Sequence, residues 1–130
     1  MALKHMHIGR TETSPEVELD LDSGTIEIVG RSLPANSESF YERVYRWIDE
    51  YLKQPREQTT VNMRLDYMDT SSSKHFYNIF QRLSSVNAQG GRVLVNWHYE
   101  IGDEEMAETG KDYQSLFSLD FNLIEVKDLF

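Results

Sequence analysis

A run of side chains that could carry or bind a phosphate lies at residues 69–73, with the sequence Asp-Thr-Ser-Ser-Ser. It follows residues 61–68, whose alternation of apolar and polar side chains predicts a strand. The helical pattern after the run has apolar positions at Phe76, Ile79, Phe80 and Leu83. Hydroxyl groups at a strand-to-helix turn lie beside free backbone N–H groups and the positive end of the helix dipole. Such a turn suits a phosphate, either bound there or attached to one of the hydroxyls.

The same run also has a purely structural explanation. Asp, Ser and Thr are preferred N-cap residues, so one member of the run is expected to cap the following helix. A helix needs only one cap, and residues 69–73 supply capping side chains in excess of that need. Both interpretations therefore stay open from the local sequence.

The four histidines are weaker candidates for chemistry. His98 falls near the end of a predicted strand and could act as a base or a phosphate donor, but no partner at catalytic spacing is evident, which favours a half-buried structural role. His5 and His7, with Met6 between them, could bind a soft metal weakly, and we interpret them as residues of a tail. His75 is expected on the surface of a helix. No recognised metal-binding spacing occurs, and no metal or cofactor is expected.

Composition limits the classes of function. A chain of 130 residues with 39% hydrophobic residues predicts one globular domain over residues 1–130, with a mobile tail at 1–10. The 22 acidic and 13 basic residues give a net charge of −9, which disfavours nucleic-acid binding. The absence of cysteine excludes disulfides and thiolate chemistry. No apolar run matches a membrane span or a secretory signal, so we expect a cytoplasmic protein.

The periodicity predicts an α/β domain. Two strands, 17–21 and 25–29, form a hairpin, and the later segments alternate in type: a helix from Asn36 or Ser37 to Gln54, a strand at 61–68, a helix at 71–87, a strand at 93–99, a weaker helix at 103–117 interrupted by Gly110, and a strand at 119–123. The first pair is antiparallel, and helical crossovers make the later strands parallel. Because most strands alternate instead of being apolar throughout, the helices should lie mainly on one face. The prediction is a two-layer domain with a mixed sheet of about five strands.

This topology predicts where a site would lie. Open α/β sheets usually bind ligands at the carboxyl ends of their parallel strands. Three segments should therefore converge at one edge: 33–37, 69–73 and 98–100. Two helix N-termini, near Ser37 and Thr70, would meet there.

Several segments resemble the SiaC family of bacterial regulatory phosphoproteins: Pro-Ala-Asn-Ser at 34–37, Leu-Asp-Tyr-Met-Asp-Thr-Ser-Ser-Ser-Lys at 65–74, Asn-Ile-Phe at 78–80, and the stretch from Gly90-Gly91 to Trp97-His98-Tyr99. The resemblance runs in order from the first hairpin to about Tyr99. It implies a STAS-like fold, similar to the domain of anti-sigma-factor antagonists, in which an Asp-Ser-Ser-Gly stretch carries the phosphoacceptor at the same turn.

In both family patterns the hydroxyl after the acid accepts the phosphate, which implies phosphorylation of Thr70, with Ser71 and Ser72 as alternates. Two positions depart from the patterns: Asp69 stands where the SiaC-type motif usually has Asn, and Ser72 replaces the glycine of the STAS motif. The residues expected to form the edge that contacts a partner are Pro34, Asn36, Ser37, Asp69, Ser71, Lys74, His98 and Tyr99.

The resemblance further implies a non-enzymatic switch. A dedicated serine/threonine kinase would phosphorylate the chain, a PP2C-type phosphatase would restore it, and the unmodified form would bind and activate a diguanylate cyclase. One alternative is an anti-sigma-factor antagonist that binds an anti-sigma kinase through the same chemistry. A small enzyme that uses the same sheet edge is a further alternative, disfavoured because the sequence has no nucleophile–base pair or phosphate-loop motif.

Overall fold

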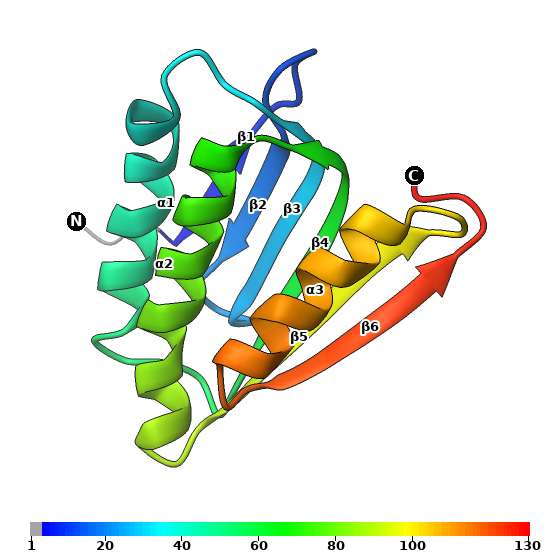
Figure 1. Cartoon of the computed structure of the whole chain (residues 1–130). Coiled ribbons are helices and arrows are strands. Elements are labelled where there is room, and N and C mark those ends of the chain that lie inside the picture. Colours follow the sequence, from blue (N-terminus) through cyan, green and yellow to red (C-terminus); the bar gives the residue numbers. More distant parts are fainter. Residues whose placement is uncertain (1–3) are drawn as a thin grey trace.

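Six strands form one mixed sheet in the order in which they occur along the chain (Figure 1). The computed structural model describes residues 4–130. Its elements are β1 (His5–Ile8), β2 (Glu16–Asp20), β3 (Thr25–Ser32), α1 (Ser37–Tyr51), β4 (Gln58–Met68), α2 (Thr70–Ala88), β5 (Arg92–Glu100), α3 (Glu104–Leu116) and β6 (Asp120–Val126). The β1–β2 and β2–β3 pairs are antiparallel, and the pairs from β3 to β6 are parallel.

All three helices cover the same face of this sheet (Figure 1). Each crossover, from β3 to β4, β4 to β5 and β5 to β6, moves to the adjacent strand in the same direction. Since such connections are nearly always right-handed, successive steps in one direction place their helices on one side. The two-layer α/β architecture predicted from the sequence is confirmed, with six strands in the sheet instead of about five.

The additional strand is β1, which lies where the sequence suggests a mobile tail over residues 1–10. It pairs antiparallel with β2, from His5 opposite Asp20 to Ile8 opposite Val17. Met6 and Ile8 pack against the hydrophobic core. The four-residue strand is too short for its alternation to stand out in the sequence, and it forms because β2 offers an unpaired edge. The expectation of a tail is therefore wrong for residues 5–8, and residues 1–3 lie outside the described part of the chain.

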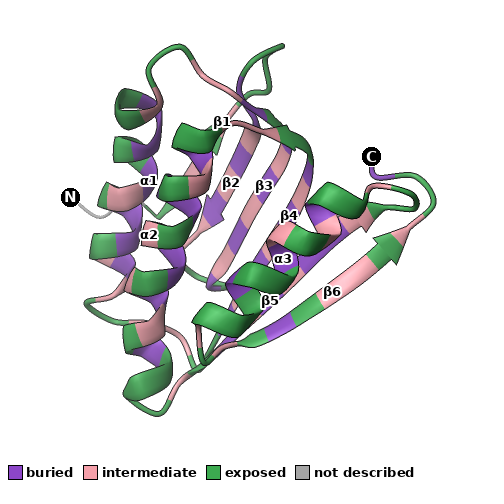
Figure 2. Ribbon diagram, in the orientation of Figure 1, coloured by how far each residue is buried: buried purple, intermediate pink, exposed green. Residues whose placement is uncertain are grey.

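The core lies between the sheet and the helices (Figure 2). Buried residues alternate with less buried ones along the strands and gather on the helix sides that face the sheet (Figure 2). The largest fully buried side chains include Trp47, Trp97, Tyr41, Tyr51, Phe76 and Phe80. Each contributes roughly 1.5–3 kcal/mol by leaving water. Within residues 4–130, no helix has both the length and the apolar character needed to cross a membrane.

The sequence predicts that Gly110 interrupts the last helix. In the structure, Gly110 instead allows that helix to approach the sheet closely. Helix α3 is continuous through Gly110. A Cβ atom added there would lie 2.6 Å from both Leu123 Cδ2 and Trp97 Cδ1. The indole N–H of Trp97 also donates to the carbonyl of Met106 at 3.0 Å. The absence of a side chain at Gly110 is thus what lets α3 pack on β5 and β6.

Substitution Gly110→Ala should therefore destabilise the domain. The added methyl group must displace Trp97 or Leu123, and such overpacking costs about 1–3 kcal/mol. The change is measured as the free energy of unfolding in urea. Gly9→Ala is the matched control, because nothing lies within 4 Å of a Cβ at that position. Equal stability of the Gly110→Ala variant and the parent chain would show that α3 packs differently.

Candidate functional site

Two helix N-termini lie together at the carboxyl edge of the parallel strands. Helix α1 begins at Ser37 and is capped by Asn36, whose side chain accepts the Ser39 N–H at 3.1 Å. Helix α2 begins at Thr70, with only Asp69 between it and the end of β4. A groove of about 660 Å³ joins the two; it is lined by Asn36, Ser37, Glu38, Ser39, Glu42 and Tyr45 from the α1 side and Ser71, Lys74, His75 and Asn78 from α2. The predicted convergence of segments 33–37 and 69–73 is confirmed.

Asp69 caps helix α2. Its Oδ1 atom accepts the backbone N–H of Ser72 at 2.8 Å and the hydroxyl of Ser71 at 3.0 Å. Partial burial raises the pKa of the Asp69 carboxyl, but the hydrogen bonds from Ser72 and Ser71 outweigh this effect, so the pKa lies below its usual value. Asp69 is thus a carboxylate at neutral pH, and it alone serves as the N-cap of α2.

Because Asp69 is the cap, the hydroxyl of Thr70 is not needed for that purpose. Thr70 is the first helical residue, and its side chain is exposed. Within the described chain, residues 4–130, no hydrogen bond engages its hydroxyl. Of the capping-type side chains in the run, the Asp69 carboxylate therefore serves as the cap, and Thr70 keeps an exposed hydroxyl that capping does not use.

The alternate serines are in different environments. Ser71 is exposed, and its hydroxyl donates to Asp69. Ser72 is completely buried; its hydroxyl donates to the Ser32 carbonyl at 3.0 Å and accepts from the Ser32 hydroxyl at 2.7 Å. The Ser32 hydroxyl in turn pairs with the buried Tyr41 hydroxyl at 2.5 Å. Ser72 joins α2 to β3 and is not accessible in the folded chain, which corrects its place among the possible acceptors.

The sequence analysis predicts His75 on the surface of a helix, but the structure shows that it is buried. Its ring stacks on Tyr41 with 5.0 Å between centroids. Burial lowers the pKa of His75, so the ring is neutral near pH 7. The helical period could have indicated this position, because His75 lies four residues before the buried Ile79.

The neutral ring of His75 connects the two helices. Its Nδ1 atom lies 2.5 Å from the Tyr45 hydroxyl, and its Nε2 atom lies 3.3 Å from the Ser37 hydroxyl. The Asn78 amide also reaches the Tyr45 oxygen, at 3.4 Å. In the consistent assignment, Asn78 donates to Tyr45, Tyr45 donates to His75, and His75 donates to Ser37. This chain of contacts fixes the first residue of α1 against α2.

His98 and Tyr99 do not join this site, contrary to the expectation. His98 pairs with Arg64 in the sheet, and β4 continues four residues beyond Arg64 to reach Met68. The His98 ring lies on the helix-free face, where its Nδ1–H donates to the Met63 carbonyl at 3.1 Å. Burial, with a smaller effect of the Arg64 charge, lowers the pKa of His98. Tyr99 packs against the hydrophobic core.

A second, acidic groove lies on the other side of the end of β4. Its volume is about 550 Å³, and it is lined by Asp66, Tyr67 and Met68 of β4 and by Asp103, Glu104, Glu105, Met106, Glu108 and Thr109 of the α3 region. Tyr67 is 49% exposed there, an aromatic side chain that the strand pattern did not single out. In the chain, Thr70 comes after Met68, which lines this groove, and before Ser71, which lines the first groove.

The remaining residues around this edge have different environments. The Tyr113 hydroxyl of α3 donates to the Ser73 carbonyl at 2.8 Å and fixes α3 beside the first turn of α2. Lys74 is exposed and lines the α1–α2 groove. Pro34 is half-buried and lines a separate depression on the outer side of α1, together with Asn36 and Arg43.

The sequence and the fold that build this edge match those of a family of regulatory proteins. Residues 8–126 match the family described as SiaC family regulatory phosphoprotein. The chain belongs to the SiaC family.

Known proteins of Pseudomonas aeruginosa are similar to the chain over nearly its whole length. An uncharacterised protein of strain UCBPP-PA14 is 28% identical over 119 residues, covering 92% of this chain and 94% of that protein. The crystal structure of apo-SiaC has a TM-score of 0.86 at 26% identity and covers 94% of this chain and 99% of its own. The crystal structure of the diguanylate cyclase SiaD in complex with its activator SiaC gives 0.88 at 27% identity, with 93% and 99% covered.

The cap should contribute to stability in a pH-dependent way. Asp69→Ala removes the acceptor of the Ser72 N–H and should cost about 0.5–2 kcal/mol, whereas Asp69→Asn keeps an acceptor and should cost less. The folded state lowers the pKa of Asp69, so its contribution is present above the usual aspartate pKa of about 3.9 and is lost as the pH falls through the lowered value. Urea unfolding of the three proteins from pH 7 to pH 2 measures this. A deficit of Asp69→Ala that grows on acidification would contradict the assignment.

Proposed function

We propose that the chain is a non-enzymatic switch that is reversibly phosphorylated on Thr70 and whose unphosphorylated form binds and activates a diguanylate cyclase. The observation that carries this proposal is that Asp69 and Thr70 have different roles. The carboxylate of Asp69 caps α2, and the exposed hydroxyl of Thr70 remains beside it at a position that a kinase can reach. Membership of a family of regulatory phosphoproteins supports the same conclusion.

The proposed partner is inferred from the structure of a similar protein in complex with an enzyme. SiaC of Pseudomonas aeruginosa is described as the activator of the diguanylate cyclase SiaD, and the present chain is similar to it over 93% of its length with a TM-score of 0.88. This favours a cyclase over an anti-sigma kinase as the regulated partner. A serine/threonine kinase and a PP2C-type phosphatase would complete the cycle by adding and removing the phosphate.

Electrostatics supports the direction of the switch. Phosphorylation of Thr70 adds about −1.5 to −2 charges beside the Asp69 carboxylate, in a chain that already has a net charge of −9. The adjacent groove contributes further carboxylates from Asp66 and from the first turn of α3. The helix N-terminus and Lys74 offset only part of this charge. A partner surface complementary to the neutral hydroxyl would lose contact and would have to desolvate the phosphate.

The exposed groups beside Thr70 suit recognition. Tyr67 presents a large aromatic surface of the kind that anchors protein interfaces. A catalytic base would need a free ring nitrogen, and the most obvious candidate near this edge is His75. Both nitrogens of its ring are already engaged, by Tyr45 and by Ser37. These features support a binding role over catalysis by the chain itself.

Phosphopeptide mapping tests the phosphosite. After incubation with the cognate kinase, we expect one dominant phosphate on Thr70, because its hydroxyl is exposed and not needed for capping. Thr70→Ala should abolish labelling, whereas Ser71→Ala should retain it. A dominant phosphate on Ser71, or labelling that survives Thr70→Ala, would refute the assignment.

Substitutions at Thr70 test the binding state. Thr70→Ala should retain the cyclase, whereas Thr70→Glu should weaken binding at least ~10-fold, or about 1.4 kcal/mol, because it places a second carboxylate beside Asp69. The measurement is the equilibrium affinity for the diguanylate cyclase recovered with the unmodified chain from its host. Gln81→Glu, which adds a negative charge at an exposed position outside both grooves, is the control for a general effect of charge. Tighter binding by Thr70→Glu would reverse the proposed sign.

A further inference from the structure

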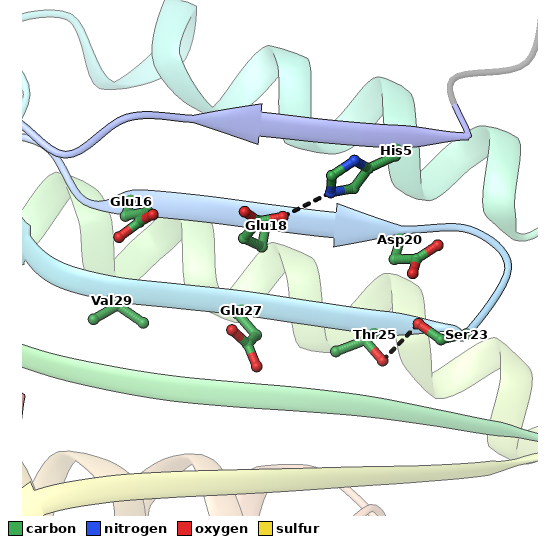
Figure 3. Close-up of a pocket in the computed structure, with 8 residues that line it drawn as sticks. All are labelled: His5, Glu16, Glu18, Asp20, Ser23, Thr25, Glu27 and Val29. Carbon is green, nitrogen blue, oxygen red and sulfur yellow. Dashed lines mark hydrogen bonds and ion pairs between the residues drawn. The ribbon is translucent and has the colours of Figure 1, made fainter.

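A cluster of metal-binding side chains lies on the helix-free face, at the edge of the sheet formed by β1 and β2. His5 and His7 alternate with apolar residues along β1, so both imidazoles lie on this face. Glu16, Glu18 and Asp20 do the same on β2. A groove of about 400 Å³ runs beside them and is lined by His5, Glu16, Glu18, Asp20, Ser23, Thr25, Glu27 and Val29 (Figure 3).

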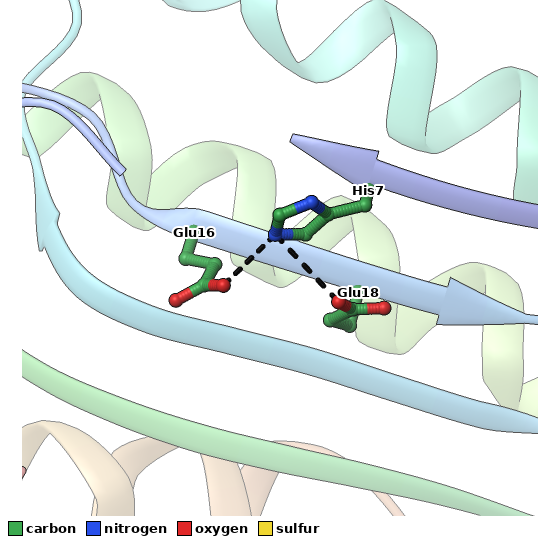
Figure 4. Close-up of side chains that lie close together, drawn as sticks. All are labelled: His7, Glu16 and Glu18. Carbon is green, nitrogen blue, oxygen red and sulfur yellow. Dashed lines mark hydrogen bonds and ion pairs between the residues drawn. The ribbon is translucent and has the colours of Figure 1, made fainter. Parts of the chain in front are cut away.

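The geometry of three of these residues fits one ion. The Nε2 atom of His7 lies 2.8 Å from Glu16 Oε2 and 3.6 Å from Glu18 Oε1 (Figure 4). One donor atom from each of the three side chains lies within 4.8 Å of the other two. Tetrahedral coordination at about 2.0–2.1 Å requires donor atoms ~3.3 Å apart, a value between the two measured distances. Small rotations of the side chains would therefore bring all three onto a common ion.

The sheet register produces this arrangement. His7 lies directly opposite Glu18 in the antiparallel β1–β2 pair, and Glu16 is the next residue of β2 on the same face. Side chains opposite each other and on the diagonal are within reach in such a pair. The sequence alone does not predict the cluster, because the ligands come from two strands and the first of them is too short to recognise.

His5 holds the second carboxylate in place. Its Nε2 atom lies 2.7 Å from Glu18 Oε2 (Figure 3). The other oxygen of Glu18 lies 3.6 Å from His7 Nε2 (Figure 4). A hydrogen bond of this kind, from outside the ligand set to a ligand carboxylate, fixes its orientation toward an ion. Asp20 and Glu27, which line the same groove, add negative charge that attracts a cation.

We propose that His7, Glu16 and Glu18 bind a divalent transition-metal ion of the Zn²⁺ type, with water in the remaining coordination position and His5 as a positioning residue for Glu18. The imidazole nitrogen favours Zn²⁺, Ni²⁺ or Cu²⁺ over Mg²⁺ and Ca²⁺, which take oxygen ligands. The ion would link β1 to β2, because His7 comes from one strand and the two glutamates come from the other. It would thereby hold the short edge strand in the sheet.

Calorimetric titration of ZnCl₂ into the full chain tests the site, with MgCl₂ as the comparison metal. We expect saturable binding of one Zn²⁺ per chain and no saturable binding of Mg²⁺. His7→Ala, Glu16→Gln and Glu18→Gln should each weaken Zn²⁺ binding at least ~10-fold, and His5→Ala should weaken it about 10-fold through the orientation of Glu18. Thermal unfolding should show a Zn²⁺-dependent rise in Tm that is lost in His7→Ala.

Glu27→Gln is the matched control, because it removes a carboxylate from the same groove that is not one of the three ligands. It should change the Zn²⁺ affinity less than ~3-fold, within the range of screened surface charges. Circular dichroism without metal verifies that each variant is folded. An absence of saturable Zn²⁺ binding by the parent chain, full binding by His7→Ala, or an equal loss in Glu27→Gln and Glu16→Gln would overturn the proposal.

Discussion

The direction of the helical crossovers is the constraint on which this structure depends. From β3 to β6 every connection moves to the adjacent strand, and all three helices consequently lie on one face. The first turns of α1 and α2 are thereby brought to the same edge of the sheet, where Asn36 and Asp69 cap them. The other face has no described helix over it and carries side chains of the strands, together with the C-terminal segment, whose Leu129 carbonyl accepts from Arg64. One topological rule thus places both the edge on which Thr70 is exposed and the helix-free face on which the histidine–glutamate cluster lies.

At this edge of the sheet, Asp69, Thr70 and Ser72 have different structural roles. Asp69 accepts the backbone N–H that the helix would otherwise leave unpaired, and Ser72 fills the interior by bonding to Ser32. Thr70 is left with an exposed hydroxyl in the capped first turn of α2. Because the backbone is fixed by its neighbours, adding a phosphate need not refold the domain. A change of charge on a fixed surface is sufficient for a switch.

The sequence predicted the order of the elements from β2 onward, the β2–β3 hairpin and the convergence of segments 33–37 and 69–73, because strong periodicity and crossover rules determine them. It missed features that depend on tertiary partners. Residues 5–8 form a strand only because β2 has a free edge, and His75 is buried because Tyr41 and Tyr45 enclose it from another helix. His98 was misplaced because the relative lengths of β4 and β5 cannot be derived from periodicity. Predictions failed where long-range contacts override a local pattern.

The central claim is that the neutral Thr70 edge is the surface that binds the cyclase. Its most direct test is calorimetric titration of the diguanylate cyclase into one preparation of the chain, before and after stoichiometric phosphorylation by its kinase. We expect phosphorylation to weaken binding at least ~10-fold, with affinity recovered after phosphatase treatment. Equal or tighter binding by the phosphorylated chain would contradict the account, since it would mean that the partner recognises the phosphate itself.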